Sequence, residues 1–98
     1  MEAYIYRAAL YCAVCAKSIK VETPLAVRYE SWFDDSENYP QGPYPAGGGE
    51  SDTPNHCDEC GTFLENPLTT DGMEYVEAAQ EDALVGAVAK MWADFYLA

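Results

Sequence analysis

The sequence contains few basic residues and has no long apolar run. Five Lys and Arg stand against 17 Asp and Glu, which gives a formal net charge of -12 at pH 7. A surface of that charge repels DNA, RNA and anionic lipid, so we expect no direct nucleic-acid binding. The sequence contains no run of about 18 apolar residues, the length needed to span a membrane. The start, Met1 to Tyr4, lacks the basic and apolar stretches of a secretory signal. These absences predict a cytoplasmic protein.

Residue patterns typical of enzymes are also missing. The chain has one histidine, His56, and shows no Gly-rich phosphate loop, no nucleophile motif and no clustered acid and base pair. We therefore predict a protein that is not an enzyme. Its 98 residues, 49% of them hydrophobic, can build one modest core, so residues 1–98 are expected to form a single domain.

Four cysteines form two closely spaced pairs. Two residues separate Cys12 from Cys15 and Cys57 from Cys60, and residues 16–56 lie between the pairs. A reducing cytosol keeps thiols free, so a four-thiolate metal site explains this spacing better than disulfides do. Reduced cysteines without a metal are one alternative. A redox pair at Cys12 and Cys15 is another, but the chain lacks the alternating strands and helices of thioredoxin-like folds. The spacing predicts one metal ion held by all four cysteines.

The ligand set favours zinc in a structural role. Four thiolates complete the tetrahedral coordination of Zn²⁺ and leave no open position for a substrate. Iron is the competing metal, because rubredoxin-type sites use the same two pairs. Gly61 directly follows the second pair, where a metal-binding turn often needs a positive φ. We expect His56 to support the site from outside the coordination sphere rather than to replace a cysteine.

The N-terminal third predicts short elements. Residues 3–11 are rich in β-formers and favour one strand that runs into the first cysteine pair. Residues 13–22 fit a strand or a helical turn equally well. Residues 25–32 alternate enough to suggest a second extended segment.

The remainder predicts a long loop and a long helix. Residues 31–55 contain four prolines and a glycine triplet, a composition that excludes regular elements and predicts a mobile loop insertion. Apolar residues then recur at three- and four-residue steps, and Asp71 with Glu74 resembles a capping box, so we expect one helix over residues 73–96. Its aromatic residues are expected in the core, with Tyr96 the most exposed. The expected class is α+β: a small zinc-stapled domain with a short N-terminal β segment, the loop and the helix.

The paired cysteines with Gly61 resemble zinc ribbons and treble-clef modules, which serve mainly in macromolecular contacts. More specifically, the stretch Gly42 to Leu68, GPYPAGGGESDTPNHCDECGTFLENPL, resembles a segment of small uncharacterised phage and bacterial proteins that also carry an upstream CxxC pair. The resemblance covers about a third of the chain plus Cys12 and Cys15. It implies a shared zinc-bearing architecture without an established activity, and for a phage protein it implies the host cytoplasm.

The negative charge is concentrated in one part of the chain. Residues 1–30 carry four bases and three acids, a net of +1, whereas residues 31–98 carry one base and fourteen acids, a net of -13. Such an excess can serve solubility alone. The sharper hypothesis is that the acids imitate nucleic-acid phosphates and occupy a basic groove of another protein, as some phage inhibitors of host defence enzymes do. The candidate interaction surface comprises Trp32, Asp34, Asp35, Glu37, Tyr39, Tyr44, Glu50 and Asp52. Its aromatic members either anchor a partner or pack the loop down.

Overall fold

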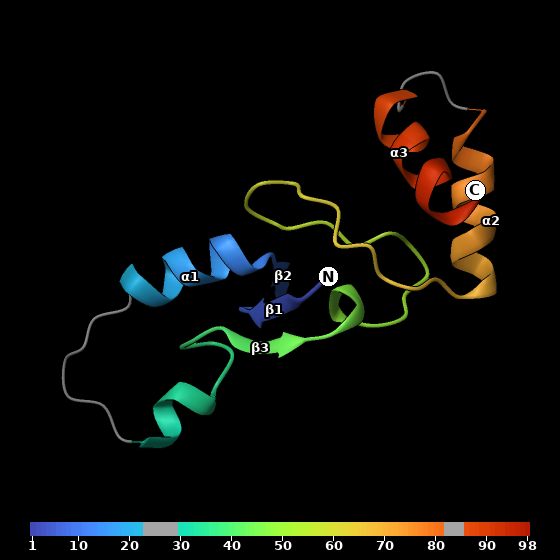
Figure 1. Ribbon diagram of the computed structural model, residues 1–98. Coiled ribbons are helices and arrows are strands. Elements are labelled where there is room, and N and C mark those ends of the chain that lie inside the picture. Colours follow the sequence, from blue (N-terminus) through green and yellow to red (C-terminus); the bar gives the residue numbers. More distant parts are fainter. Residues whose placement is uncertain (23–29, 82–85) are drawn as a thin grey trace.

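The computed structural model describes residues 1–22, 30–81 and 86–98 (Figure 1). Within these ranges a three-stranded antiparallel sheet and three α-helices are present, so the α+β class is observed. The molecule is elongated, with principal extents of 52 × 22 × 17 Å. None of the helices in the described ranges is long and apolar enough to cross a membrane.

The N-terminal segment forms a β-hairpin and not the single strand expected over residues 3–11. Strand β1 (Ala3–Tyr6) pairs with β2 (Ala9–Tyr11), with Tyr4 opposite Tyr11. Arg7 and Ala8 make the turn with φ values of 49° and 62°. A two-residue turn of this kind usually contains Asn or Gly. Here the Arg7 amide donates to the carbonyl of Ser36 at 2.9 Å, so a distant segment helps to hold the turn.

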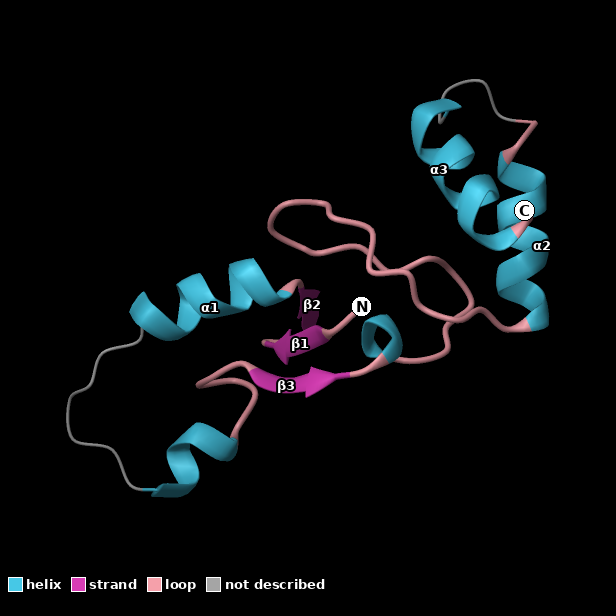
Figure 2. Ribbon diagram, in the orientation of Figure 1, coloured by secondary structure: helices cyan, strands magenta, loops and turns pink. Residues whose placement is uncertain are grey.

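The expectation that residues 31–55 contain no regular structure is wrong. Strand β3 (Gln41–Tyr44) completes the sheet in the order β2-β1-β3, and short 3₁₀ helices cover Glu30–Asp34 and Ala46–Gly48 (Figure 2). Proline is tolerated here because β3 is an edge strand, where one row of amides has no partner strand. The extended segment expected over residues 25–32 lies mostly on residues 23–29, outside the described residues.

Residues 13–22, which fitted either structure by sequence, form helix α1 (Ala13–Glu22). The carbonyl of Cys12 accepts the first helical hydrogen bond, from the Ala16 amide at 2.9 Å. The helix therefore begins inside the first cysteine pair. This position places Cys15 in its first turn.

The C-terminal region forms two helices and not the single helix expected over residues 73–96. Helix α2 (Thr70–Ala79) and helix α3 (Gly86–Tyr96) lie side by side (Figure 1). Gln80 ends α2 and donates from Nε2 to the carbonyls of Val76 and Ala89, which fastens the two helices together. The N-cap is Thr69, whose Oγ1 accepts from the Gly72 amide at 3.1 Å, so the capping box at Asp71 is also wrong.

Buried apolar residues form two small clusters, and adjacent residues of the chain connect them. Leu64 belongs to a cluster with Ala3, Cys12 and Cys57, and Phe63 to a cluster with Val76 and Trp92. Successive side chains of an extended segment point to opposite sides, so residues 63 and 64 reach into different clusters. The chain just after the second cysteine pair thus joins the cysteine half of the molecule to the helical half.

Candidate metal centre

The structure brings all four cysteines together. The Sγ atoms of Cys12, Cys15, Cys57 and Cys60 all lie within 4.8 Å of one another, and none is in a disulfide. Tetrahedral Zn–thiolate coordination, with bonds of about 2.3 Å, separates the sulfurs by roughly 3.8 Å. The Cys12 and Cys60 sulfurs are already 3.7 Å apart. The group can therefore hold one metal ion with only small side-chain movements.

The first pair lies at the N-terminus of α1. Cys12 precedes the helix and Cys15 lies in its first turn. The free amides and the positive end of the helix dipole favour negative charge at this position. Four thiolates with one divalent ion carry a net charge of -2, so the helix end stabilises the loaded site electrostatically.

The second pair lies at the tip of a tight backbone hairpin. His56 pairs with Phe63 across it, the Cys57 amide donates to the Thr62 carbonyl at 2.8 Å, and the Gly61 amide donates to the Cys57 carbonyl at 2.9 Å. Gly61 has a φ of 78°, the left-handed conformation that glycine adopts readily. A side chain at Gly61 would meet no neighbour within 4 Å, so the backbone angle and not space calls for glycine here.

A backbone hydrogen bond connects the two cysteine-bearing segments. The Asp58 amide, inside the second pair, donates to the carbonyl of Leu10 in β2 at 2.8 Å. Leu10 and Tyr11 also pack against the cluster that contains Cys12 and Cys57. The sheet therefore places the first pair against the second.

Hydrogen bonds prepare the second pair for metal binding. The Thr62 hydroxyl, 2.9 Å from Cys60 Sγ, and a backbone hydrogen bond from Thr62 lower the pKa of the Cys60 thiol to about 6. Burial raises the pKa of Cys57, but backbone hydrogen bonds outweigh it and leave that pKa below its ordinary value. Burial, followed by hydrogen bonds to the other three cysteines, raises the pKa of Cys15. Metal ions bind the thiolate form, so the lowered pKa values of the second pair favour the metal-binding form of Cys57 and Cys60, and the raised pKa of Cys15 does not.

His56 connects the candidate metal-binding turn, residues 57–62, to α3. Its Nδ1 lies 2.8 Å from the Gly61 carbonyl, and its Nε2 accepts from Trp92 Nε1 at 3.0 Å. The indole can only donate, so the tautomer with its proton on Nδ1 satisfies both contacts. Both ring nitrogens thus have partners other than the four sulfurs.

The residues of the candidate interaction surface do not form one patch. Trp32 and Phe33 rings contact edge to face at 5.0 Å, and Phe33 contacts Tyr39 at 5.1 Å, so these aromatics pack on one another beside exposed Asp34, Asp35 and Glu37. Tyr44 is exposed on β3. Glu50 and Asp52 are also exposed, but Asp52 accepts from the hydroxyl of Thr69 at the start of α2, at the other end of the molecule (Figure 1).

Sequence reasoning missed two residues that support the site, Thr62 and Trp92. Thr62 stands two positions after Cys60, where a hydroxyl can reach the ligand sulfur, so its spacing was a usable signal. Trp92 was expected only as a core residue. Its hydrogen bond to His56 spans 36 positions, and no local pattern predicts it.

Comparison with protein-family models, with curated proteins and with solved structures finds no match for this chain. The resemblance of residues 42–68 to phage and bacterial proteins therefore stays a prediction. The convergence of the four cysteine sulfurs does not depend on that resemblance.

Proposed function

We propose that this protein is a non-enzymatic interaction module whose fold is held together by one structural zinc ion. The observation that carries the proposal is that the four sulfurs converge within 4.8 Å while Cys12 and Cys57 make up half of the buried residues of the cysteine-side cluster. The other buried members among the described residues are only Ala3 and Leu64, with partly buried Leu10 and Tyr11 against them. An apolar cluster this small usually needs a further source of stability such as a metal ion. A bound ion supplies the missing stabilisation, since metal-binding free energy adds to folding free energy.

Metal analysis and chelation test the structural role. We expect one zinc per chain, a lower unfolding temperature after chelation, and loss of hydrogen-exchange protection across β1, β2 and α1. Cys12→Ser and Cys57→Ser should have the same effect, because each removes one ligand. Val14→Ser is the matched control inside the first pair, since Val14 is 75% exposed. A chelated sample with unchanged melting and unchanged exchange would refute the structural role.

A rubredoxin-like iron site for electron transfer is the second candidate. The observation that favours it is the exposure of Cys60, because a ligand sulfur at the surface would allow electrons to enter and leave. Iron bound by four thiolates is coloured, whereas the zinc protein is colourless. A visible spectrum together with metal analysis therefore separates the two candidates.

The charge of the protein supports a basic protein as its partner. With zinc and four thiolates the formal net charge changes from -12 to about -14. Exposed Asp34, Asp35 and Glu37 lie close together in sequence and beside a cluster of aromatic rings. The sharper form of the proposal is that this surface occupies a basic groove which otherwise binds nucleic acid.

Salt dependence and competition test the partner proposal. Electrostatic attraction acts over a Debye length of roughly 8 Å at physiological salt, so association should slow as salt rises. Neutralising Asp34, Asp35 and Glu37 together should reduce the association rate, and duplex DNA should compete for a partner that handles nucleic acid. An affinity that does not change between low and high salt would contradict the proposal.

A further inference from the structure

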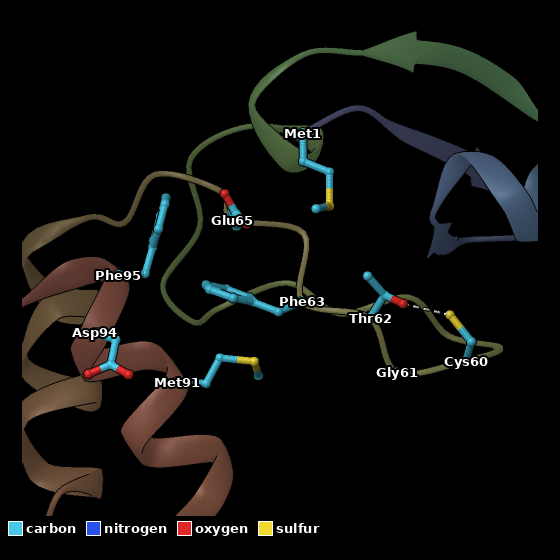
Figure 3. Close-up of a pocket in the computed structure, with 9 residues that line it drawn as sticks. All are labelled: Met1, Cys60, Gly61, Thr62, Phe63, Glu65, Met91, Asp94 and Phe95. Carbon is cyan, nitrogen blue, oxygen red and sulfur yellow. Dashed lines mark hydrogen bonds between the residues drawn. The ribbon is translucent and has the colours of Figure 1, made fainter.

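An open pocket of about 620 Å³ lies between the metal-binding turn and α3 (Figure 3). Its apolar wall consists of Met1, Phe63, Met91 and Phe95, and the turn Cys60 to Thr62 forms another side. Met91 and Phe95 lie four positions apart on one face of α3. Phe95 was expected in the core, but it is 47% exposed, and Met1 is 54% exposed. Only Phe63 is buried, so large apolar side chains surround the pocket without covering it.

The charged side chains at the pocket edge are both acidic. Glu65 and Asp94 are both exposed, and figure 3 shows the Asp94 side chain on α3 and the Glu65 side chain near Phe95. The described lining residues include no Lys, Arg or His, and the N-terminal ammonium of Met1 offsets only one of the two carboxylates, so the lining keeps a net negative charge. An apolar floor with an acidic edge is complementary to an apolar side chain that has basic neighbours.

The backbone at Glu65 adds a second, independent observation. Glu65 has a φ of 54°, a left-handed conformation that costs a residue with a Cβ about 1–2 kcal/mol. Its neighbours fix this conformation: Leu64 and Asn66 are fully buried, and Asn66 accepts from the Asn55 amide at 2.7 Å. Gly or Asn would suit such a backbone better. The fold therefore keeps an acidic side chain at the pocket edge where the local backbone favours glycine.

We propose that this pocket receives a large apolar side chain, Leu or bulkier, of a partner protein, presented by a segment in which Lys or Arg flanks that residue. This inference rests on the proposed function, because it assumes a basic partner protein and names the pocket beside Met91 and Glu65 as the place where that partner binds. Anionic lipid does not fit, since the pocket edge and the whole chain are acidic. A second copy of this chain is repelled by the same net charge.

The test uses three short peptides and the zinc-loaded full chain. One peptide has Leu flanked by Arg, the second has Ser in place of Leu, and the third has Glu in place of Arg. Amide chemical-shift changes map the site, and we expect the first peptide to shift Gly61, Thr62 and residues 91–95. The Ser and Glu peptides should bind at least about tenfold more weakly, because they lose the buried apolar group or the charge complementarity.

Two pairs of variants separate the pocket from general effects of charge and packing. Met91→Ala should weaken binding of the first peptide by about tenfold, whereas Val88→Ala, a similarly exposed position of α3 outside the pocket, should not. Glu65→Gln with Asp94→Asn should weaken it by about fivefold. Glu74→Gln with Glu77→Gln changes the net charge equally on exposed positions of α2 and should have a smaller effect.

Each alternative outcome has a definite meaning. If the first peptide binds in a salt-dependent manner but shifts residues 32–39 instead, the pocket assignment is wrong and the basic-partner proposal stands. If none of the peptides binds, both are wrong. Equal effects of Met91→Ala and Val88→Ala would also overturn the pocket assignment. Glu65→Gly checks the backbone argument, because it should weaken binding while leaving the unfolding temperature unchanged or raised.

Discussion

Replacing His56 by Phe tests the connection between the metal-binding turn and the helical half of the protein. The imidazole bonds both Gly61 and Trp92, and its ring also lies 5.4 Å from the Phe63 ring. Phe keeps an aromatic ring at this position but can make neither hydrogen bond. The substitution thus removes the two polar contacts with little change in ring packing.

The structure gives the expected magnitude. Losing the exposed hydrogen bond to the Gly61 carbonyl costs about 0.5–1.5 kcal/mol, and leaving the Trp92 N–H buried without a partner costs about 1–3 kcal/mol, which together gives about 1.5–4.5 kcal/mol. Trp92 is only 8% exposed, so its indole N–H would be left largely without water. We expect His56→Phe to lower the free energy of unfolding of the zinc-loaded protein by about 2–3 kcal/mol, out of roughly 5–15 kcal/mol for a domain of this size. Zinc affinity should fall by about tenfold, because the Gly61 carbonyl beside the ligand loses its donor.

Denaturant unfolding of four proteins measures the stability effect: wild type, His56→Phe, Trp92→Phe and the double variant. If the hydrogen bond is real, the two substitutions are coupled by about 1 kcal/mol. Trp32→Phe with His56→Phe is the matched control. Its effects should be additive, since Trp32 lies in the 3₁₀ segment Glu30–Asp34, at the opposite end of the molecule from α3 (Figure 1). Competition with a chromophoric chelator measures the zinc affinity. A coupling energy of zero, or unchanged stability of His56→Phe, would refute the proposed connection.

Two further predictions concern residues beside this connection. Burial, with a contribution from Glu65, raises the pKa of Tyr96 from 10.0 to about 12, so the folded state favours the neutral phenol. The stabilisation that the neutral Tyr96 phenol provides is therefore complete below pH 10 and is lost as the pH rises from about 10 through about 12. Tyr96→Phe removes the hydrogen bond to the Asn66 carbonyl and should lower the free energy of unfolding by about 1 kcal/mol at neutral pH. Unfolding curves measured at increasing pH should show the difference between variant and wild type narrowing. A difference that stays constant would contradict the raised pKa of Tyr96. Gly61 has a positive φ, which Asn tolerates better than Ala, so Gly61→Ala should lower the free energy of unfolding by about 1 kcal/mol and Gly61→Asn by less. Unfolding temperatures of the zinc-loaded variants measure this difference. Equal losses would show that the backbone angle is not the cause.

The sequence by itself identified the four cysteines as one candidate ligand set. The spacing of Cys12 with Cys15 and of Cys57 with Cys60 is a local property, because two residues between cysteines bring two sulfurs to one turn. The same locality explains why Gly61, directly after the second pair, could be expected to have a positive φ. The α+β class followed from the short β-rich start and from the helical periodicity near the C-terminus.

Only the tertiary structure decided how these parts are divided and joined. Arg7 and Ala8 carry no turn signal, yet they form a turn because the backbone near Ser36 binds Arg7. Residues 41–44 became a strand because the edge of β1 was open to them, despite Pro43. The apolar periodicity over residues 73–96 fits one long helix or two packed helices equally well, and the bonds of Gln80 across to Ala89 belong to the second arrangement. In each case the structure depends on contacts between residues that are separated in sequence, and composition and periodicity describe only local patterns.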